Sequence, residues 1–272
     1  MDDGSTDATM QILHQYASIQ PNMQVHQNEQ NLGYIKNFEK GMGLANGYFI
    51  SPCDQDDVWD TDKIRLMVEA IGDFPMIFCD SELVDENLVS MNKKISTLKN
   101  LQTFNNCLYF VTDNCVAGHA TLFTKKLFEA TTPFNTTIAH DWWLPYVSTF
   151  FGGIQYLDKS LVLYRNHTGN VIGAVKTGTN KKTWASRLEK KKQERATAKK
   201  RLQLFYDKCP DEFIKEKEII KQLIISYDSF SLRNNFKRVV LYLKYQSYFL
   251  AIKKRTVLYK YIFCLKMFFK MR

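Results

Sequence analysis

Apolar residues in the first two thirds of the chain follow two patterns that alternate along the sequence. In one pattern, apolar side chains recur every three or four residues, which predicts helices near residues 8–20, 34–46, 60–71 and 141–151. In the other they form short runs, which predict strands at residues 23–27, 48–51, 75–79, 119–124 and 161–165. Residues 81–118 are polar and irregular and are expected to form a loop. Strands that alternate with helices predict an α/β fold, with a mostly parallel sheet flanked by helices.

The C-terminal third has a different pattern, helical and strongly basic. Apolar residues recur at helical spacing from Trp184 to Phe205, and no acidic residue follows Asp228. The last predicted helix carries an apolar face, with Lys260 and Lys266 turned away from it. The residues on that face are Leu258, Tyr261, Ile262, Leu265, Phe268 and Phe269. A basic amphipathic helix fits the interfacial zone of an anionic bilayer, and the alternative is a helix packed on the body with a solvated basic face.

Charge divides the chain in the same way. Residues 1–175 contain 11 Lys and Arg against 20 Asp and Glu, and residues 176–272 contain 26 against 8, which gives +9 overall. We therefore predict a catalytic domain at 1–175 and a basic helical membrane-associating region at 176–272. An anionic membrane surface is the expected partner of the basic region. Nucleic acid is not expected, because no recognised nucleic-acid module accompanies the lysines.

Cysteine spacing and the N-terminal residues indicate in which cellular compartment the protein is expected. None of the six cysteines forms a C-x-x-C pair, so a zinc site is not expected and the thiols are predicted to be reduced. The chain begins without a basic, apolar signal sequence, and no apolar run reaches about 18 residues, so a spanning helix is not predicted. These observations predict a cytoplasmic protein, peripheral on the inner face of the cell membrane.

Acidic side chains gather at the ends of predicted strands. Asp54, Asp56 and Asp57 place three carboxylates within four residues, directly after the run at 48–51. Such a cluster is costly unless a cation lies among the charges, and Mn²⁺ or Mg²⁺ prefers oxygen ligands of this kind. Asp2 and Asp3 also follow what resembles a strand end, and ligands of α/β sheets bind beyond the carboxyl ends of the strands. The alternative interpretation of the cluster is a solvated acidic turn that caps the next helix.

Six segments together resemble the family 2 nucleotide-sugar glycosyltransferases, and within them the bacterial rhamnosyltransferases. The segments are DDGSTD (2–7), NLGYIKNFEKGM (31–42), DQDDVW (54–59), GHATLF (118–123), HDWW (140–143) and LYRNHTGN (163–170). The resemblance implies a Rossmann-like α/β domain of nucleotide-diphospho-sugar transferase type. It also implies an inverting, metal-dependent enzyme that moves a sugar, with rhamnose suggested, from a nucleotide-diphosphate donor. The acceptor would be a hydroxyl of a glycan or lipid-linked molecule in surface polysaccharide synthesis.

The resemblance also implies roles for individual residues. The donor nucleotide would be bound by Asp2, Asp3, Lys36 and Asp54. The metal, Mn²⁺ or Mg²⁺, would be bound by Asp54, Asp56, Asp57 and His167.

The remaining roles concern the acceptor. Asp141 matches the general base, which a weakly nucleophilic sugar hydroxyl needs, and the alternative role for Asp141 is a helix N-cap. Trp142 and Trp143 are expected to stack on a sugar and to raise the pKa of Asp141, and Gly118 to let the chain pass close to the acceptor. His119 and His140 are interpreted as structural, and Trp59 as a packing residue behind the acidic loop.

One departure from the family pattern concerns the N-terminus. Relatives begin with a strand and a turn ahead of the DDGSTD segment, whereas here Met1 directly precedes Asp2. We therefore expect a catalytic domain that lacks its first strand. The alternative function is a truncated, non-catalytic remnant that serves as a membrane-surface or assembly partner.

Overall fold

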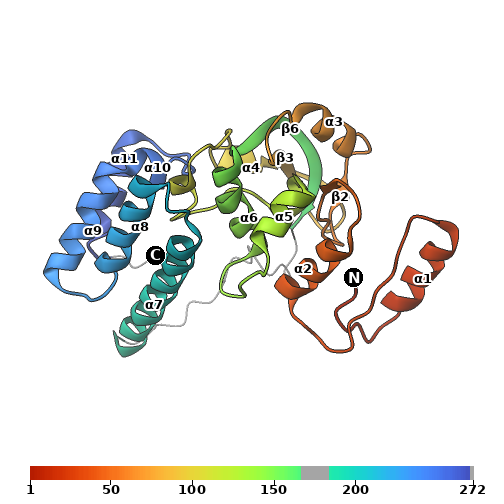
Figure 1. Cartoon of the computed structure of the whole chain (residues 1–272), viewed down its shortest axis with the longest axis horizontal. Coiled ribbons are helices and arrows are strands. Elements are labelled where there is room, and N and C mark those ends of the chain that lie inside the picture. Colours follow the sequence, from red (N-terminus) through yellow and green to blue (C-terminus); the bar gives the residue numbers. More distant parts are fainter. Residues whose placement is uncertain (167–183, 270–272) are drawn as a thin grey trace.

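A central sheet with helices on its faces forms the body of the protein (Figure 1). The computed structural model describes residues 1–166 and 184–269. Within them the sheet has the strand order β1-β5-β3-β6-β2, and β4 pairs with the far part of β3. The strands are β1 (Phe49–Ile50), β2 (Val58–Trp59), β3 (Met76–Val84), β4 (Ser90–Lys94), β5 (Thr121–Thr124) and β6 (Ile154–Arg165). The α/β fold expected from the sequence is confirmed.

Strand direction is more mixed than the predicted mostly parallel sheet. The longest ladder, β3 with β6, is parallel, while β5 pairs antiparallel with both β1 and β3, and β2 and β4 are antiparallel to their partners. Strands β1, β3 and β6 therefore do run in one direction, and β5 is inserted against them. Apolar runs carry no information about strand direction, so the sequence pattern could not reveal this insertion. As a result, the amino end of β5 lies at the edge where β1 ends, beside Phe78 near the start of β3.

The helices of the body include the four that the apolar spacing predicted and two short ones that it did not, at residues 95–98 and 125–131. They are α1 (Thr9–Ile19), α2 (Tyr34–Leu44), α3 (Lys63–Ala70), α4 (Ile95–Leu98), α5 (Lys125–Thr131) and α6 (His140–Ser148). Helix α2 buries Ile35 and Met42, as predicted, because their spacing of seven residues places both on one face. Helix α1 differs, since none of its residues, all of which are described, is buried. Its apolar face is therefore exposed in the described structure.

Two segments differ from the elements predicted for them. The run at 23–27 forms only one bridge, in which Gln27 pairs parallel with Asp2. The stretch at 81–118, expected to be a loop, contains the end of β3, strand β4, helix α4 and the 3₁₀ turn η1 (Cys107–Tyr109). β4 is exposed along its whole length, so its sequence has no apolar alternation by which it could have been recognised.

The C-terminal region is helical, as predicted, and it packs directly on the body. It contains α7 (Trp184–Lys208), α8 (Ile214–Ser226), α9 (Leu232–Lys244), α10 (Gln246–Phe249) and α11 (Val257–Lys266). Phe205 of α7 stacks on Trp143 of α6, and the Tyr146 hydroxyl donates a 2.6 Å hydrogen bond to the Phe205 carbonyl. One continuous apolar core therefore joins the two parts. In the described residues no helix combines the length and the apolar character that crossing a bilayer requires.

Candidate functional site

A cavity of about 520 Å³ lies at the edge of the sheet where β1 ends. The loop after β1 forms one side, and the 3₁₀ turn η2 (Gly118–Ala120), which leads into β5, lies opposite. Helix α2 and the first turn of α6 complete the wall. The lining residues used below are Tyr34, Phe38, Asp54, Asp56, Gly118, His119, His140 and Asp141. We call this the first cavity.

Two carboxylates and an imidazole meet at one side of the first cavity. Nδ1 of His119 lies 2.9 Å from Oδ2 of Asp57 and 3.4 Å from Oδ2 of Asp54. Ligand atoms of all three side chains lie within 4.8 Å of one another. Asp57 is fully buried behind the cavity, and its Oδ1 accepts a 3.0 Å hydrogen bond from the Arg165 backbone N–H. We call Asp54, Asp57 and His119 the acid–imidazole cluster.

The acid–imidazole cluster favours a positive charge. Burial by itself lowers the pKa of His119, but the carboxylates of Asp54 and Asp57 outweigh it, so the pKa of His119 lies above its ordinary value. Within the described residues, buried Oδ2 of Asp57 receives no well-directed hydrogen bond. Nε2 of His119 is 3.0 Å from the Ser81 hydroxyl, which leaves Nδ1 facing the carboxylates. These residues fit a divalent cation, for which a proton on His119 would substitute.

Sequence analysis missed His119, which it treated as structural. His119 is distant in sequence from Asp54 and Asp57 and reaches them because β5 runs antiparallel to β1 and β3. The amino end of β5 therefore brings η2 to the edge where β1 ends. A signal existed in the GHATLF segment, but only knowledge of the strand direction would have placed its histidine beside the acidic loop.

Asp141 faces the first cavity from the first turn of α6. Burial raises the pKa of Asp141 to about 6, the charge of Asp54 adds to the shift, and His119 opposes it. The N-cap of α6 is Ala139, so the alternative prediction that Asp141 caps the helix is wrong. A carboxylate with a raised pKa, beside a candidate cation site, can accept a proton near neutral pH.

Gly118 closes the gap between η2 and α6. A Cβ atom at this position would lie 3.0 Å from Nε2 of His140 and 3.6 Å from Cβ of Asp141. Gly118 thus allows η2 to pack closely on the first turn of α6, and its approach to an acceptor stays a prediction.

Substituting Gly118→Val should lower the free energy of unfolding by about 1–3 kcal/mol, because the added carbons press on the buried ring of His140. Urea unfolding measures the change. Gly43→Ala in α2 is the matched control, since its new Cβ would meet nothing nearer than 4.0 Å and should be neutral or stabilising. A Gly118→Val variant as stable as the original protein would contradict the close packing.

Residues 1–132 match the family model described as glycosyl transferase family 2. The match covers just under half of the chain, and this segment is therefore similar to glycosyltransferase family 2 domains. The match contains the whole acid–imidazole cluster and ends shortly before Asp141.

Curated relatives agree with the family match. EpsH of Bacillus subtilis, named as a glycosyltransferase, is 27% identical over 184 residues, which are 63% of this chain and 53% of EpsH. TuaG of the same organism, named for teichuronic acid biosynthesis, is 36% identical over 69 residues, 25% of this chain and 27% of TuaG. The chain spans about half the length of the first relatives that it matches.

A solved structure shares the fold. Residues 1–349 of S. aureus TarS, in complex with UDP-GlcNAc, superpose with a TM-score of 0.54 at 17% identity, covering 98% of this chain and 70% of that chain. The similarity extends to the C-terminal helices, because it covers nearly the whole chain.

The carboxylates of Asp2 and Asp3 form hydrogen bonds within the matched segment itself. Asp2 is buried and accepts hydrogen bonds from the backbone N–H groups of Gly4 and Ser5 and from the Gln27 amide. The bonds from Ser5 lower the pKa of Asp2. Asp3 accepts from the Asn28 amide and the Leu32 backbone. Both residues tie the DDGSTD turn to the segment before α2, and contact with a nucleotide stays a prediction.

Lys36 points away from the wall that α2 presents to the first cavity. Its ammonium pairs with Glu39 at 2.5 Å, while Tyr34 and Phe38, four residues apart, line the cavity. The sequence motif therefore identified the correct helix but not the face that meets the cavity.

Asp56 lines the first cavity but lies outside the acid–imidazole cluster. Its backbone carbonyl accepts a 2.8 Å hydrogen bond from Nε of Arg165, which holds the acidic loop against the end of β6. Behind the loop, Trp59 packs under the ammonium of buried Lys63, 3.2 Å from the ring centroid, as its predicted packing role requires. His167, the fourth predicted metal ligand, lies outside the described residues.

The two tryptophans after Asp141 do not flank a sugar in the first cavity. Trp143 is buried in the core, where its indole N–H donates to the Thr131 carbonyl, so the predicted sugar-binding role of Trp143 is wrong. Trp142 is half-buried and lines a separate cavity. The helix explains the difference, because successive residues of α6 point about 100° apart, and a sugar contact of Trp142 stays a prediction.

Proposed function

We propose that this protein is a metal-dependent glycosyltransferase that moves a sugar from a nucleotide-diphosphate donor to a hydroxyl group. The observation that supports it is the shared first cavity, where Asp54 and His119 of the acid–imidazole cluster face Asp141. A non-catalytic remnant would have no need for such an arrangement. The family 2 match and the similarity to TarS, which was solved with UDP-GlcNAc, support a nucleotide-sugar donor.

Each charged residue has a distinct part in the proposed reaction. Asp54, Asp57 and His119 would hold Mn²⁺ or Mg²⁺, which would supply positive charge where the diphosphate departs. Asp141 accepts the proton of the acceptor hydroxyl as that oxygen attacks the anomeric carbon. A base on one side and a leaving group on the other favour a single displacement with inversion. Tyr34 and Phe38 provide apolar walls that limit water around the donor sugar.

Purified protein with Mn²⁺ and a panel of UDP-, GDP- and dTDP-sugars tests the proposal. Transfer or slow hydrolysis of one donor, lost on chelation with EDTA, is the expected result. The rhamnosyltransferase-like segments make dTDP-rhamnose the first donor to assay, whereas the TarS similarity makes UDP-sugars the second. The absence of metal-dependent binding to every nucleotide in the panel would overturn the proposal.

The rate of sugar transfer should fall about tenfold for each pH unit below the pKa of the general base. Asp141 must be deprotonated, and its pKa is raised to about 6 from an ordinary 3.8, so activity should fall as the pH drops below about 6. A cation beside Asp54 would oppose the contribution of the Asp54 charge to the raised pKa of Asp141. The acid limb of the pH–rate profile would then lie at a lower pH. Turnover measured as a function of pH under saturating donor checks this. An acid limb at or above about pH 7 would point to a histidine instead.

We further propose that α11 docks on an anionic membrane that carries a lipid-linked acceptor. Cys264 and Met267 bury one side of this segment, while Leu258, Leu265 and Phe269 are 70%, 58% and 70% exposed. Lys254, Arg255, Lys260 and Lys266 lie in or next to the same segment, in a region that carries 26 basic and 8 acidic residues. Apolar exposure beside excess positive charge suits an acidic lipid surface.

The double variant Leu258→Glu/Leu265→Glu should bind phosphatidylglycerol vesicles about tenfold more weakly, since it removes apolar contact and adds repulsion. Vesicle flotation measures the bound fraction. Ile19→Glu is the matched control, because Ile19 is equally exposed, at 68%, on α1. Equal binding to phosphatidylcholine vesicles, or no effect of the double variant, would contradict membrane docking through α11.

A further inference from the structure

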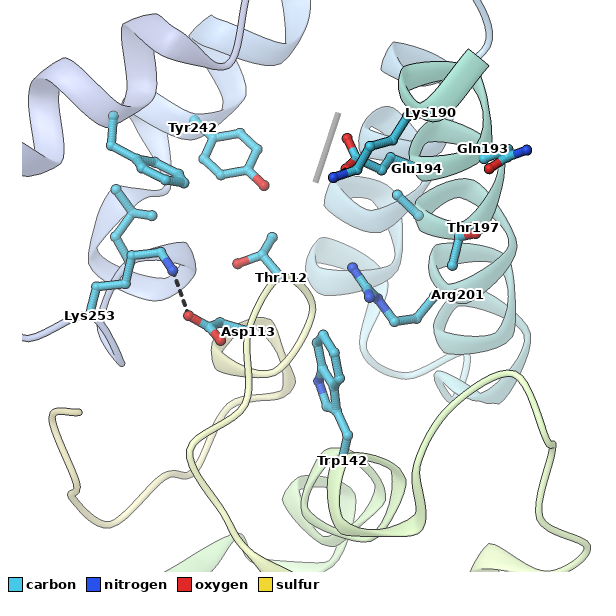
Figure 2. Close-up of a pocket in the computed structure, with 13 residues that line it drawn as sticks. Thr112, Asp113, Trp142, Lys190, Gln193, Glu194, Thr197, Arg201, Tyr242 and Lys253 are labelled. Carbon is cyan, nitrogen blue, oxygen red and sulfur yellow. Dashed lines mark hydrogen bonds and ion pairs between the residues drawn. The ribbon is translucent and has the colours of Figure 1, made fainter. Parts of the chain in front are cut away.

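A second cavity of about 530 Å³ lies between the glycosyltransferase body and the C-terminal helices (Figure 2). The body contributes Thr112, Asp113 and Trp142, and the far side comes from α7, α9 and the segment around Lys253. Figure 2 shows Trp142 pointing up from α6 and Arg201 reaching toward it from α7. We call this the second cavity.

The two cavities share a wall. Asp113 lines the second cavity while Asn114 lines the first, and Trp142 lines the second while Asp141 lines the first. The Asn114 amide donates a 3.1 Å hydrogen bond to the Asp141 carbonyl, which joins the two pairs. A molecule bound in the second cavity would therefore lie just across this wall from the proposed base.

The carboxylates of the second cavity already have counter-ions. Asp113 pairs with Lys253 at 2.6 Å and with Lys99 at 3.0 Å, and these two lysines overcome the effect of burial and lower the pKa of Asp113. Glu194 pairs with Lys190 at 3.5 Å, one helical turn away on α7. Both acidic groups that line the cavity are thus neutralised without Arg201.

Arg201 is the one cation lining the second cavity for which the described residues provide no carboxylate at ion-pair distance. Its guanidinium lies 4.3 Å from the centroid of the Trp142 ring, and no carboxylate of the described residues forms an ion pair with it. Its Nε is buried and has no hydrogen-bond partner in the described structure. Burial accordingly lowers the pKa of Arg201 from its ordinary value. A desolvated guanidinium without an anion is costly, and a ligand that supplies the anion would remove that cost.

The rest of the lining suits a sugar. Thr112, Gln193 and Thr197 offer hydroxyl and amide groups, and the volume is in the range of cavities that hold small organic ligands. The guanidinium forms a fork that matches phosphate and carboxylate oxygens. Lys190 and Lys253 add positive charge on either side, so three cations face two carboxylates among the described lining residues.

We propose that the second cavity binds an anionic group, a phosphate or a carboxylate, carried by the saccharide acceptor, with Arg201 as its anchor. This assignment rests on the proposed glycosyltransferase function, because it treats the occupant as the acceptor that Asp141 deprotonates. The anion would hold the acceptor in place while a neighbouring sugar unit reaches the first cavity.

The test uses glucose 6-phosphate, glucuronate and glucose as probes at matched ionic strength. Arginine Nε–H signals in ¹H–¹⁵N NMR spectra of the whole protein report on the unpartnered atom directly, and Arg201→Lys assigns the signal. We expect glucose 6-phosphate or glucuronate to shift the Arg201 Nε–H signal and glucose to leave it unchanged. A response to the first probe alone assigns phosphate, and a response to the second assigns carboxylate.

Arg201→Met should weaken binding of the responding probe about tenfold or more. Arg195→Met is the matched control, because Arg195 belongs to the same helix but lies over Phe230, 4.4 Å from its ring centroid. An equal loss in both variants, an equal response to glucose, or no Arg201 signal change with any probe would overturn the proposal. The wild-type signal decides the matter even if Arg201→Met does not fold.

Binding of UDP with Mn²⁺, measured by calorimetry on the same samples, separates this proposal from the proposed function. Arg201→Met should leave that binding unchanged, since Arg201 lines the second cavity and does not line the first. Loss of probe binding with intact nucleotide binding supports the anion subsite. Nucleotide binding without any probe response leaves the glycosyltransferase proposal in place and overturns only the subsite.

Discussion

Replacing Asp141 with Asn should lower the rate of sugar transfer by about 10²–10⁴-fold, because the acceptor hydroxyl loses the group that takes its proton. Affinity for the donor should change little, since the acid–imidazole cluster stays in place. Steady-state kinetics at saturating donor, together with calorimetric binding of UDP and Mn²⁺, separate the two effects. Asp73→Asn, on an exposed turn before β3, is the matched control and should keep full activity.

Stability provides an independent check on the same variant. The pKa of Asp141 is raised in the folded state, so above about pH 6 the ionised carboxylate favours the unfolded state. The neutral amide of Asn removes that cost, and thermal unfolding near pH 8 should occur at the same temperature or higher. An inactive Asp141→Asn protein that is also strongly destabilised would indicate a structural role instead of the proposed base.

Substitutions in the acid–imidazole cluster should abolish metal-dependent nucleotide binding, with contrasting costs in stability. Asp54→Asn and Asp57→Asn should each weaken Mn²⁺ binding by about 100-fold or more, because each removes a charged ligand. Asp54 is 39% exposed in its side chain, so its variant should fold normally. Asp57 is fully buried against His119, and its variant should also lose about 3–5 kcal/mol of folding free energy.

Electron paramagnetic resonance of free Mn²⁺ and urea unfolding measure the two quantities separately. Asp56→Asn is the matched comparison, because Asp56 stands between the other two in sequence but outside the cluster. It should weaken Mn²⁺ binding less than either cluster variant. A larger loss of Mn²⁺ affinity in Asp56→Asn than in Asp57→Asn would mean that Asp56 is a metal ligand, as predicted from the DQDDVW motif.

Local sequence signals predicted the parts of the site that depend on local structure. Asp54 and Asp141 each follow or begin a regular element with a clear boundary, and both line the first cavity. The same reasoning located α2 through its buried positions Ile35 and Met42. Such features can be predicted from the spacing of apolar residues within a helix or strand and from the position at which that element ends.

Features that depend on distant packing could not be predicted in this way. His119 reaches the acidic loop only through the reversed direction of β5, which no pattern in the segment reveals. Trp142 and Trp143 look equivalent as neighbours in sequence, yet one lines a cavity and the other fills the core. That difference depends on where Phe205 lies, 62 residues beyond Trp143 in the chain.

The core shared by α6 and α7 bears on how such a chain can evolve. Trp143 and Tyr146, directly behind the proposed base, rest on Phe205 of the C-terminal region. Recombination that replaced the basic helices with those of another protein would remove the side chains on which the buried face of α6 packs. Exchange of the helices that give the molecule its positive charge should therefore destabilise the half that carries the first cavity.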